Sequence, residues 1–426
     1  MKNLIKFLLK PLNPVDLEFG SRYPRNPYNF YERIRVIIIG YQTKDKYFFF
    51  YILNFIKYLI LRFLVLIYFP LILILKIFKY KFVVVNFWQF GAFAQQMSFL
   101  IRDLDKEEIK KYIVYVPNFS VIDRSLLNIF KKKINIVSNT FLCIILIPLF
   151  HSNLLRKSIL KYDEHFIETK TYKINQKIDN FNKSYFDLEN QQKINLENSF
   201  FDLFGFKSKD KYIAINLRTG SYYKDFFYNS RNSNPKKYLP IFEYLKKKNY
   251  KIICFNNEIK EFYNIENVYI YSEYVKKHIK GFEIFILKET DLFITNNFGP
   301  KNVSSMLCVP TLVCDLFPYG SLIPYNKTSI TIPKIIEKDN KKLNFREILD
   351  YGYFYGIKKT ENINLIENTR EDILNGVNEI LYISGNKNNL SNNRILKRII
   401  NKNIPCVDGL GSVSEMFLEK NKFLLK

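Results

Sequence analysis

The sequence has little glycine, proline, cysteine and tryptophan. Its 426 residues include 14 Gly, 15 Pro, 5 Cys and 1 Trp, and so few Gly and Pro exclude the collagen-like and low-complexity classes. The cysteines are odd in number, form no C-x-x-C pair and lie near none of the three histidines, so we expect neither a disulfide framework nor a structural zinc site. We predict reduced thiols, packed as in cytoplasmic proteins, at Cys143, Cys254, Cys308, Cys314 and Cys406.

Several catalytic and nucleotide-binding signatures are also absent. There is no G-x-G-x-x-G, which argues against a dinucleotide oxidoreductase, and no Walker A, G-x-S-x-G or H-E-x-x-H sequence. The one D-x-D, Asp103–Asp105, lies in the charged stretch RDLDKEEIKK and is typical of a solvated helix end. We therefore predict no metal ion and no cofactor.

Acidic residues are few beside basic ones. Lys and Arg number 65 and Asp and Glu 40, which gives a net charge of +25. Such a charge is typical of nucleic-acid-binding proteins. Here, however, the lysines are spread along the chain, and no RRM, helix-turn-helix or zinc-finger signature is present. Abundant Asn, Ile, Phe and Tyr share A/T-rich codons with Lys, which explains much of the excess. We predict no nucleic-acid partner, because anionic lipid or a phosphate-bearing substrate suits the charge equally well.

One long hydrophobic run covers residues 48–79. From Tyr58 to Leu75, a stretch of 18 residues, the only charge is Arg62, and a helix of that length is about 27 Å long, close to a bilayer core. Arg62, a kink at Pro70 and basic residues on both sides leave three alternatives open: a monotopic or re-entrant anchor, a true span, or a buried core helix. The first is favoured, so a membrane surface is an expected partner. A second apolar run, 141–150, is too short to span and predicts core or a shallow dip.

After residue 81 short apolar strands alternate with helices, which is typical of parallel sheets with right-handed crossovers. Hydrophobic residues make up 48% of the chain, enough for a sizeable core. We predict an α/β fold with two Rossmann-like doubly wound domains facing a cleft. The predicted strands are 82–87, 112–116, 134–137, 211–216, 251–255, 267–271, 291–295 and 311–314. The predicted divisions are a basic region 1–47, the hydrophobic segment 48–79, one domain over 80–205, a second over 206–345 and a helical region 346–426.

Two strand ends carry candidate phosphate ligands. Arg218 follows strand 211–216, where an open α/β sheet presents its ligand, and a guanidinium grips a diphosphate with two donors. The turn after strand 291–295 leads into a helix at Pro300, whose free N–H groups and dipole favour a phosphate. The alternatives are a surface arginine and an ordinary capped turn. The predicted phosphate-binding residues are Arg218, Asn296, Asn297, Phe298, Gly299, Lys301 and Asn302.

Three further residues are predicted at the rim of the cleft. Gly91 stands in the first β–α turn, where a glycine permits close backbone approach. Arg231 and Asn232 come just before a helix that Asn234 caps. The alternatives are a simple turn glycine and a solvated loop.

The stretch DLFITNNFGPKNVSSMLCVPTLVCDLFP (291–318) resembles the nucleotide-sugar-binding region of GT-B glycosyltransferases, above all the strand, "T-N-D-S-G-P" turn and "G-V-P-T" of the heptosyltransferases. Together with LRTGSYYKDFFYNSRN (217–232), IPK (332–334) and SEMFLEKN (414–421) it also resembles a family of bacterial surface-polysaccharide glycosyltransferases. The resemblance covers roughly residues 60–425.

This resemblance implies a membrane-associated GT-B glycosyltransferase at the cytoplasmic face of the membrane. It would move a sugar from a nucleotide-diphosphate sugar to a glycan or lipid-linked acceptor in surface polysaccharide biosynthesis, without a metal. The domain over 80–205 would bind the acceptor and that over 206–345 the donor. Arg218, the helix amides after Asn297, and Lys301 would stabilise the leaving diphosphate, while the resemblance identifies no base.

Two positions depart from the family pattern. The family has a His after the glycine of the first turn, where this chain has Ala92, and the family's small donor-turn residues are Asn296, Asn297 and Phe298 here. The change at Ala92 leaves one alternative open, a catalytically inactive GT-B module that binds a glycan or nucleotide. The basic charge leaves a second alternative, a nucleic-acid-binding protein.

Overall fold

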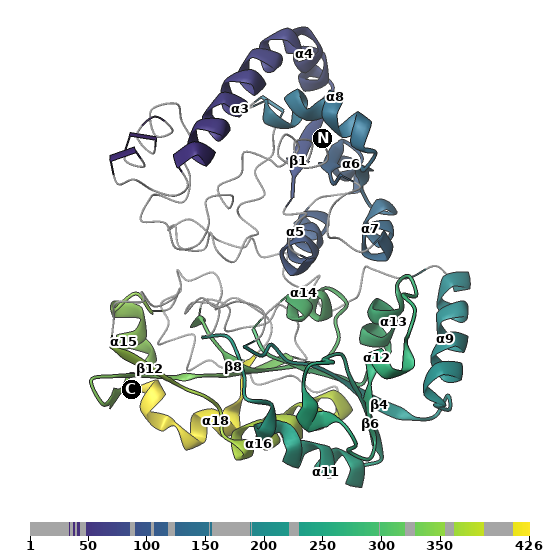
Figure 1. Cartoon of the computed structure of the whole chain (residues 1–426), viewed down its shortest axis with the longest axis vertical. Coiled ribbons are helices and arrows are strands. Elements are labelled where there is room, and N and C mark those ends of the chain that lie inside the picture. Colours follow the sequence, from purple (N-terminus) through teal and green to yellow (C-terminus); the bar gives the residue numbers. More distant parts are fainter. Residues whose placement is uncertain are drawn as a thin grey trace. The chain divides into compact units, whose positions relative to one another are not determined.

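The computed structural model describes residues 34, 37–38, 41–42, 48–85, 90–103, 106–117, 124–152, 154–155, 188, 190–220, 230–297, 299–319, 329–353, 362–386 and 412–426. These residues belong to two compact units. The first unit contains α3, α4, β1, α6, β2, β3 and α8, and the second contains α5, nearly all of α7, and every element from α9 onward (Figure 1).

The first unit is built on a small parallel sheet. Its strands lie in the order β1 (Lys81–Val84), β2 (Tyr112–Tyr115) and β3 (Asn135–Val137), and each neighbouring pair is parallel. Phe150 of α8 (Thr140–His151) packs on this sheet, with its ring centroid 4.9 Å from that of Phe82 and 4.8 Å from that of Tyr115. The short helix α6 (Lys106–Ile109) precedes β2.

The hydrophobic run forms two helices, α3 (Phe48–Ile67) and α4 (Phe69–Ile77). None of the described helices is by itself long and apolar enough to cross a membrane. Phe55–Ile67 and Phe69–Ile77 meet that requirement only as a pair, bent by 67° at the break between them. Pro70 lies in the first turn of α4, where its missing N–H is not needed.

The second unit is a doubly wound α/β structure. All strand pairs of its seven-stranded sheet are parallel. The order is β13 (Ser412–Val413), β9 (Ser329–Pro333), β8 (Thr311–Leu316), β7 (Leu292–Thr295), β4 (Lys211–Asn216), β5 (Tyr250–Cys254) and β6 (Val268–Ile270). The chain starts at β4, runs outward through β5 and β6, and returns to β7 before running outward the other way. The strand order therefore reverses between β4 and β7.

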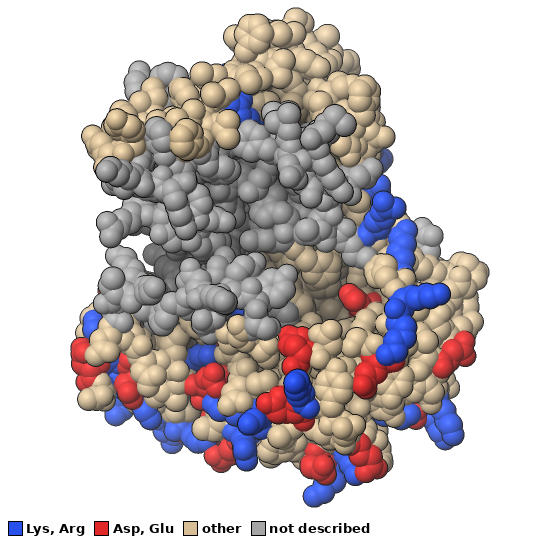
Figure 2. Space-filling view, viewed as in Figure 1, with Lys and Arg blue, Asp and Glu red and all other residues tan. Residues whose placement is uncertain are grey.

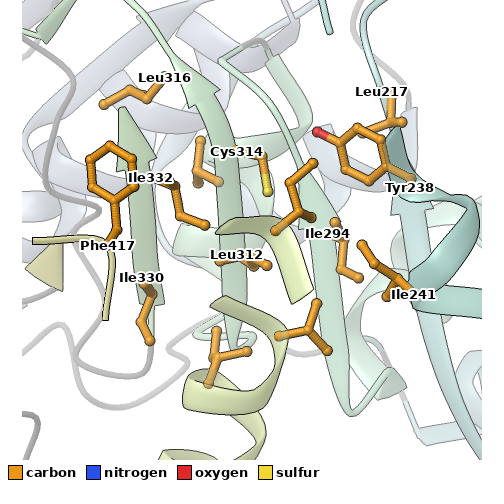
Figure 3. Packing of buried hydrophobic residues seen from close by; sticks show 14 of the residues in the cluster. Leu217, Tyr238, Ile241, Ile294, Leu312, Cys314, Leu316, Ile330, Ile332 and Phe417 are labelled. Atoms are coloured by element: carbon orange, nitrogen blue, oxygen red, sulfur yellow. The ribbon is translucent and has the colours of Figure 1, made fainter. Parts of the chain in front are cut away.

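Helices cover both faces of this sheet. The helices on one face are α11 (Leu239–Lys247), α16 (Arg370–Asn386) and α18 (Glu415–Lys420), and those on the other are α13 (Phe282–Glu289) and α14 (Gly299–Met306) (Figure 1). Figure 3 shows Ile241 of α11 and Phe417 of α18 in the same core as Ile294, Leu312 and Ile330 of the sheet.

The remaining elements of the second unit surround this framework. A small antiparallel sheet has the order β11 (Lys341–Lys342), β10 (Ile335–Lys338) and β12 (Ile363–Ile366). The other helices and 3-10 turns are α5 (Phe90–Asp103), α7 (Arg124–Lys131), α9 (Asn190–Phe204), η5 (Pro235–Tyr238), η6 (Lys260–Phe262), α12 (Tyr271–Tyr274), α15 (Phe345–Asp350) and η10 (Lys422–Leu425).

The predicted α/β class with parallel sheets is confirmed, and each of the eight predicted strands is present. Helix α14 begins at Gly299, one residue before the predicted start. Strands β12 and β13 lie in the stretch predicted to be helical, because two to four paired residues are too few to give a period-2 signal. Of the four described cysteines, Cys143, Cys254 and Cys314 are buried and all four are free thiols. Cys406 lies outside the described residues.

Candidate functional site

The candidate site lies at the point where the strand order of the large sheet reverses. Strands β4 and β7 are hydrogen-bonded parallel neighbours, and Asn216 is the register partner of Thr295. Asn296 directly follows Thr295, and Arg218 lies two residues after Asn216, so both residues lie just beyond the carboxyl ends of neighbouring strands. In doubly wound sheets ligands bind beyond the carboxyl ends of the strands at this reversal.

Asn296 holds the backbone around Arg218. Its Oδ1 accepts a hydrogen bond from Arg218 N at 2.8 Å, and its Nδ2 donates to the carbonyl oxygens of Arg218 and Arg231, each at 3.0 Å, and to Ser233 Oγ at 3.1 Å. The side chain is fully buried. Asn296, which we predicted to bind phosphate, thus links the end of β4 to the segment 231–233 and fixes the position of the Arg218 backbone.

A second asparagine acts in the same way on the other side of β4. Leu217 N donates to Asn256 Oδ1 at 2.6 Å, and Asn256 Nδ2 donates to Leu217 O at 2.7 Å. Asn256 and Asn296, here called the asparagine pair, therefore continue the hydrogen bonding of the sheet for two residues past the end of β4. The sequence analysis missed Asn256, although a polar residue directly after the predicted strand 251–255 was a usable signal.

Asn297 and Lys301 hold the start of α14 in place. Asn297 Nδ2 donates to Phe317 O at 2.7 Å, and its Oδ1 accepts from Lys301 Nζ at 3.3 Å. Lys301 is only 3% exposed, which is rare for a lysine unless it is paired. Its ammonium is therefore held in the first turn of the helix that begins at Gly299. Phe298 lies outside the described residues.

The predicted rim residues Arg231 and Asn232 lie at this same end of the sheet. Arg231 O accepts from Asn296, and Asn232 O accepts from Lys334 Nζ at 2.7 Å. Lys334, which follows β9, was not a predicted site residue; the sequence showed it only within the IPK resemblance. Its ammonium also lies 3.8 Å from Glu367, so a buried cation ties the rim segment to the end of a third strand.

Asp315, near the end of β8, is a fully buried carboxyl. Its Oδ1 accepts from Asn368 N at 2.7 Å. Burial raises the pKa of Asp315 above its ordinary value, against the opposing effect of the Lys334 charge, and burial lowers the pKa of Lys334. The folded protein therefore holds a proton on Asp315 at pH values where the unfolded chain has lost it.

This proton predicts a pH dependence that can be measured. Between pH 3.8 and the raised pKa the native state binds more protons than the unfolded state, so the free energy of unfolding falls as the pH rises, by at most about 1.4 kcal/mol per unit. Asp315→Asn removes the titrating group and keeps an acceptor for Asn368. Urea unfolding from pH 4 upward should show the wild type losing stability relative to the variant as the pH rises. A constant difference across that range would contradict the buried, protonated carboxyl.

Gly91 lies against Gly299 in the second unit. A Cβ atom placed on Gly91 would lie 2.2 Å from Gly299 Cα and 2.7 Å from Gly299 O. Asn302 Nδ2 donates to Gly91 O at 3.3 Å and to Gln95 Oε1 at 3.2 Å. The predicted close approach at Gly91 is thus made to the backbone of α14, and Asn302 is engaged in holding α5 there.

Gly91→Ala should destabilise the protein by about 1–3 kcal/mol, because backbone atoms cannot move aside as a flexible side chain can. Gly220→Ala is the matched control, since its Cβ would meet a single side-chain atom at 3.6 Å. Thermal unfolding of both variants is the measurement. Equal melting temperatures for the two would contradict the α5–α14 contact.

A separate cavity of about 600 Å³ lies among α11, α16 and α18. Tyr250, the first residue of β5, contributes to its lining, so it opens near the amino ends of the strands and away from Arg218. Geometry and charge at the carboxyl ends, rather than cavity size, define the candidate site.

Comparisons with known proteins give distant structural likenesses. No family model and no curated protein matches the sequence. Among solved structures, the chain is similar to E. coli ADP-heptose lps heptosyltransferase II (TM-score 0.44, 13% identity, 72% of this chain and 99% of that one). It is also similar to a family 9 glycosyl transferase from Veillonella parvula (TM-score 0.44, 10% identity, 71% and 97%). A third likeness is to an E. coli heptosyltransferase with ADP-2-deoxy-2-fluoro heptose (TM-score 0.32, 9% identity, 63% and 96%).

These three structural neighbours are two heptosyltransferases and a family 9 glycosyl transferase.

Proposed function

We propose that this protein is a GT-B glycosyltransferase whose donor is a nucleotide-diphosphate sugar. The observation that carries the proposal is the placement of Arg218. Its backbone is held by Asn296 at the strand-order reversal, beside the segment that leads into α14. A diphosphate needs fixed positive potential from more than one side, and an arginine together with a helix N-terminus can supply it.

The proposed chemistry is stabilisation of the leaving group. When the bond from the sugar to the diphosphate breaks, negative charge grows on the phosphate oxygens. We propose that the Arg218 guanidinium, the first amides of α14 and the Lys301 ammonium compensate this charge, because positive groups fixed before the reaction lower such a barrier most. These groups supply the charge compensation without a metal ion.

The proposed acceptor is a glycan or lipid-linked glycan of a surface polysaccharide. Support for this class comes from the sequence resemblance over residues 217–232, 291–318 and 414–421. A base deprotonates the acceptor hydroxyl as it attacks.

Binding by the purified full chain tests the proposal. Calorimetric titration with ADP, UDP, GDP and CDP, each beside its monophosphate, should show at least one diphosphate binding more than tenfold tighter than its monophosphate, with no loss of binding in EDTA. The matching nucleotide sugars should then show slow donor hydrolysis. Equal affinities for monophosphate and diphosphate, or no binding of any of them, would overturn the donor site.

A further inference from the structure

Helix α3 buries its lysine and exposes apolar side chains, which is the opposite of a helix in a water-soluble protein. Its lysine, Lys57, is only 3% exposed, and Leu61, one turn on, is 5% exposed. The outward side is apolar instead, with the exposed residues Leu53, Ile56, Leu59, Ile60, Phe63, Leu66 and Ile67. A helix packed for water would turn its lysine outward and its leucines inward.

Helix α4 extends this apolar face beyond the bend. Ile72 is buried, while Phe69, Leu71, Leu73 and Ile74 are exposed. Of the side chains that the structure describes between Leu53 and Ile74, every exposed one is apolar. The α3–α4 surface in Figure 2 is accordingly almost without charge.

Helix α8, distant in sequence, adds a second apolar element in the same unit. It packs against α3, and its carboxyl-terminal half is buried on the sheet through Ile147, Leu149 and Phe150. In its first half several apolar side chains are exposed: Phe141 is 69% exposed, and Leu142, Ile144 and Ile145 are 39–48% exposed. A helix of 12 residues is too short to span a bilayer, so these side chains fit a shallow insertion.

Basic residues stand at the ends of these apolar elements. Lys76 and Lys79 are exposed at the end of α4. Lys131, also exposed, donates from its Nζ to Ser138 Oγ at 2.9 Å, directly before the N-cap Asn139 of α8. Positive charge bordering an apolar face complements anionic headgroups bordering hydrocarbon.

We propose that the exposed faces of α3, α4 and α8 form one membrane-docking surface on the first unit, inserted into a single leaflet of an anionic bilayer. The cytoplasmic leaflet supplies such lipids. The bend of 67° between the two helices turns α4 well away from the direction of α3, so the pair does not form one straight helix across a bilayer. Protein partners fit less well, because the core of a protein interface still averages about one third polar area, whereas the exposed side chains here are apolar throughout.

The proposal departs from the sequence prediction in one respect. The sequence favours a membrane anchor for the segment 48–79 and predicts core or a shallow dip for the run 141–150. The structure divides the second run: its last half is core, and its first half belongs to the docking surface. The docking is independent of donor chemistry, so it stands or fails separately from the proposed function.

Flotation with sealed vesicles tests the surface. The full chain, purified in detergent and reconstituted by dilution, should float with vesicles of phosphatidylglycerol and phosphatidylcholine, and less with phosphatidylcholine alone. Phe63→Glu/Leu66→Glu in α3 and Phe141→Glu/Ile145→Glu in α8 should each lower the partition coefficient at least tenfold. The matched control is Tyr382→Glu/Met416→Glu, which alters two exposed apolar side chains of the second unit and should change nothing.

Folding is checked by circular dichroism and by thermal unfolding, and each docking variant should match the wild type in both. Wild-type protein that fails to float overturns the surface as a whole. Loss of binding in the α3 variant with full binding in the α8 variant overturns the part assigned to α8. A control that loses binding equally shows that any added charge prevents docking, and it overturns the assignment to these helices.

Labelling from one side tests single-leaflet insertion against a span. Phe49→Cys and Phe78→Cys place thiols near the two ends of the helix pair, at side chains that are 76% and 62% exposed. In a background with Cys308→Ser and Cys406→Ser, both should react with a membrane-impermeant maleimide added outside vesicles to which the protein has bound. Reaction at one position only, with the other reacting after the vesicles are opened, would replace insertion by a span.

Discussion

Arg218→Ala should lower the rate of sugar transfer by about 10²–10³, as removal of a single preorganised donor to a developing anion does, and should abolish nucleotide-sugar binding. The change should leave the free energy of unfolding nearly unaltered. The hydrogen bonds that Asn296 makes at this residue use the backbone N–H and C=O of Arg218, which alanine retains.

Two variants make the Arg218 experiment specific. Arg346→Ala removes an exposed arginine from α15 in the same unit and should bind the donor normally. Arg218→Lys keeps the charge and loses the two-pronged geometry, so it should recover only part of the activity. Full donor binding by Arg218→Ala, measured by titration, would remove Arg218 from the site.

Asn296→Ala should cost about 3–5 kcal/mol of unfolding free energy. Its side chain makes four hydrogen bonds, each worth about 1 kcal/mol net, and the variant leaves buried backbone groups of Arg218 unsatisfied. Donor binding should fall as well, since Arg218 is no longer fixed. Urea unfolding and titration on the same preparation separate the two effects.

Comparing the stability and the donor binding of Asn296→Ala shows which role Asn296 has. Asn257→Ala, at an exposed asparagine near the same edge of the sheet, is the control and should change neither property. If Asn296→Ala kept wild-type stability and lost only donor binding, Asn296 would be a ligand and not the support of Arg218. The double variant Asn296→Ala/Arg218→Ala should bind no worse than Arg218→Ala alone, because both changes act through one guanidinium.

The location of the candidate site followed from local signals in the sequence. The strand 211–216 reads KYIAIN and the strand 291–295 reads DLFIT, and such apolar runs between helices predict parallel strands whatever the rest of the chain does. Asn296 comes directly after the second of these strands, and Arg218 comes two residues after the first. Parallel strands end at the same edge, so composition and order were enough to place both residues there.

The sequence did not predict which strands are hydrogen-bonded neighbours. That β4 pairs with β7, and not only with β5, depends on contacts between residues about 80 positions apart. The pairing of β4 with β7 brings Asn296 to the backbone of Arg218, and the pairing of β4 with β5 brings Asn256 to the backbone of Leu217. A side-chain amide after a strand has the same sequence signature in either role, because its partners come from other segments.

What the sequence determined by itself is therefore the α/β class, eight of the strands, the hydrophobic segment and the charge at the candidate site, since each depends on residues near one another in the chain. The tertiary structure alone decided that Gly91 meets Gly299 and that Asn296 supports Arg218. It also decided that Lys57 points inward while its apolar neighbours face outward. A hydrophobic helix can bury any side until its neighbours are in place, so the side that remains exposed is set by packing between distant segments.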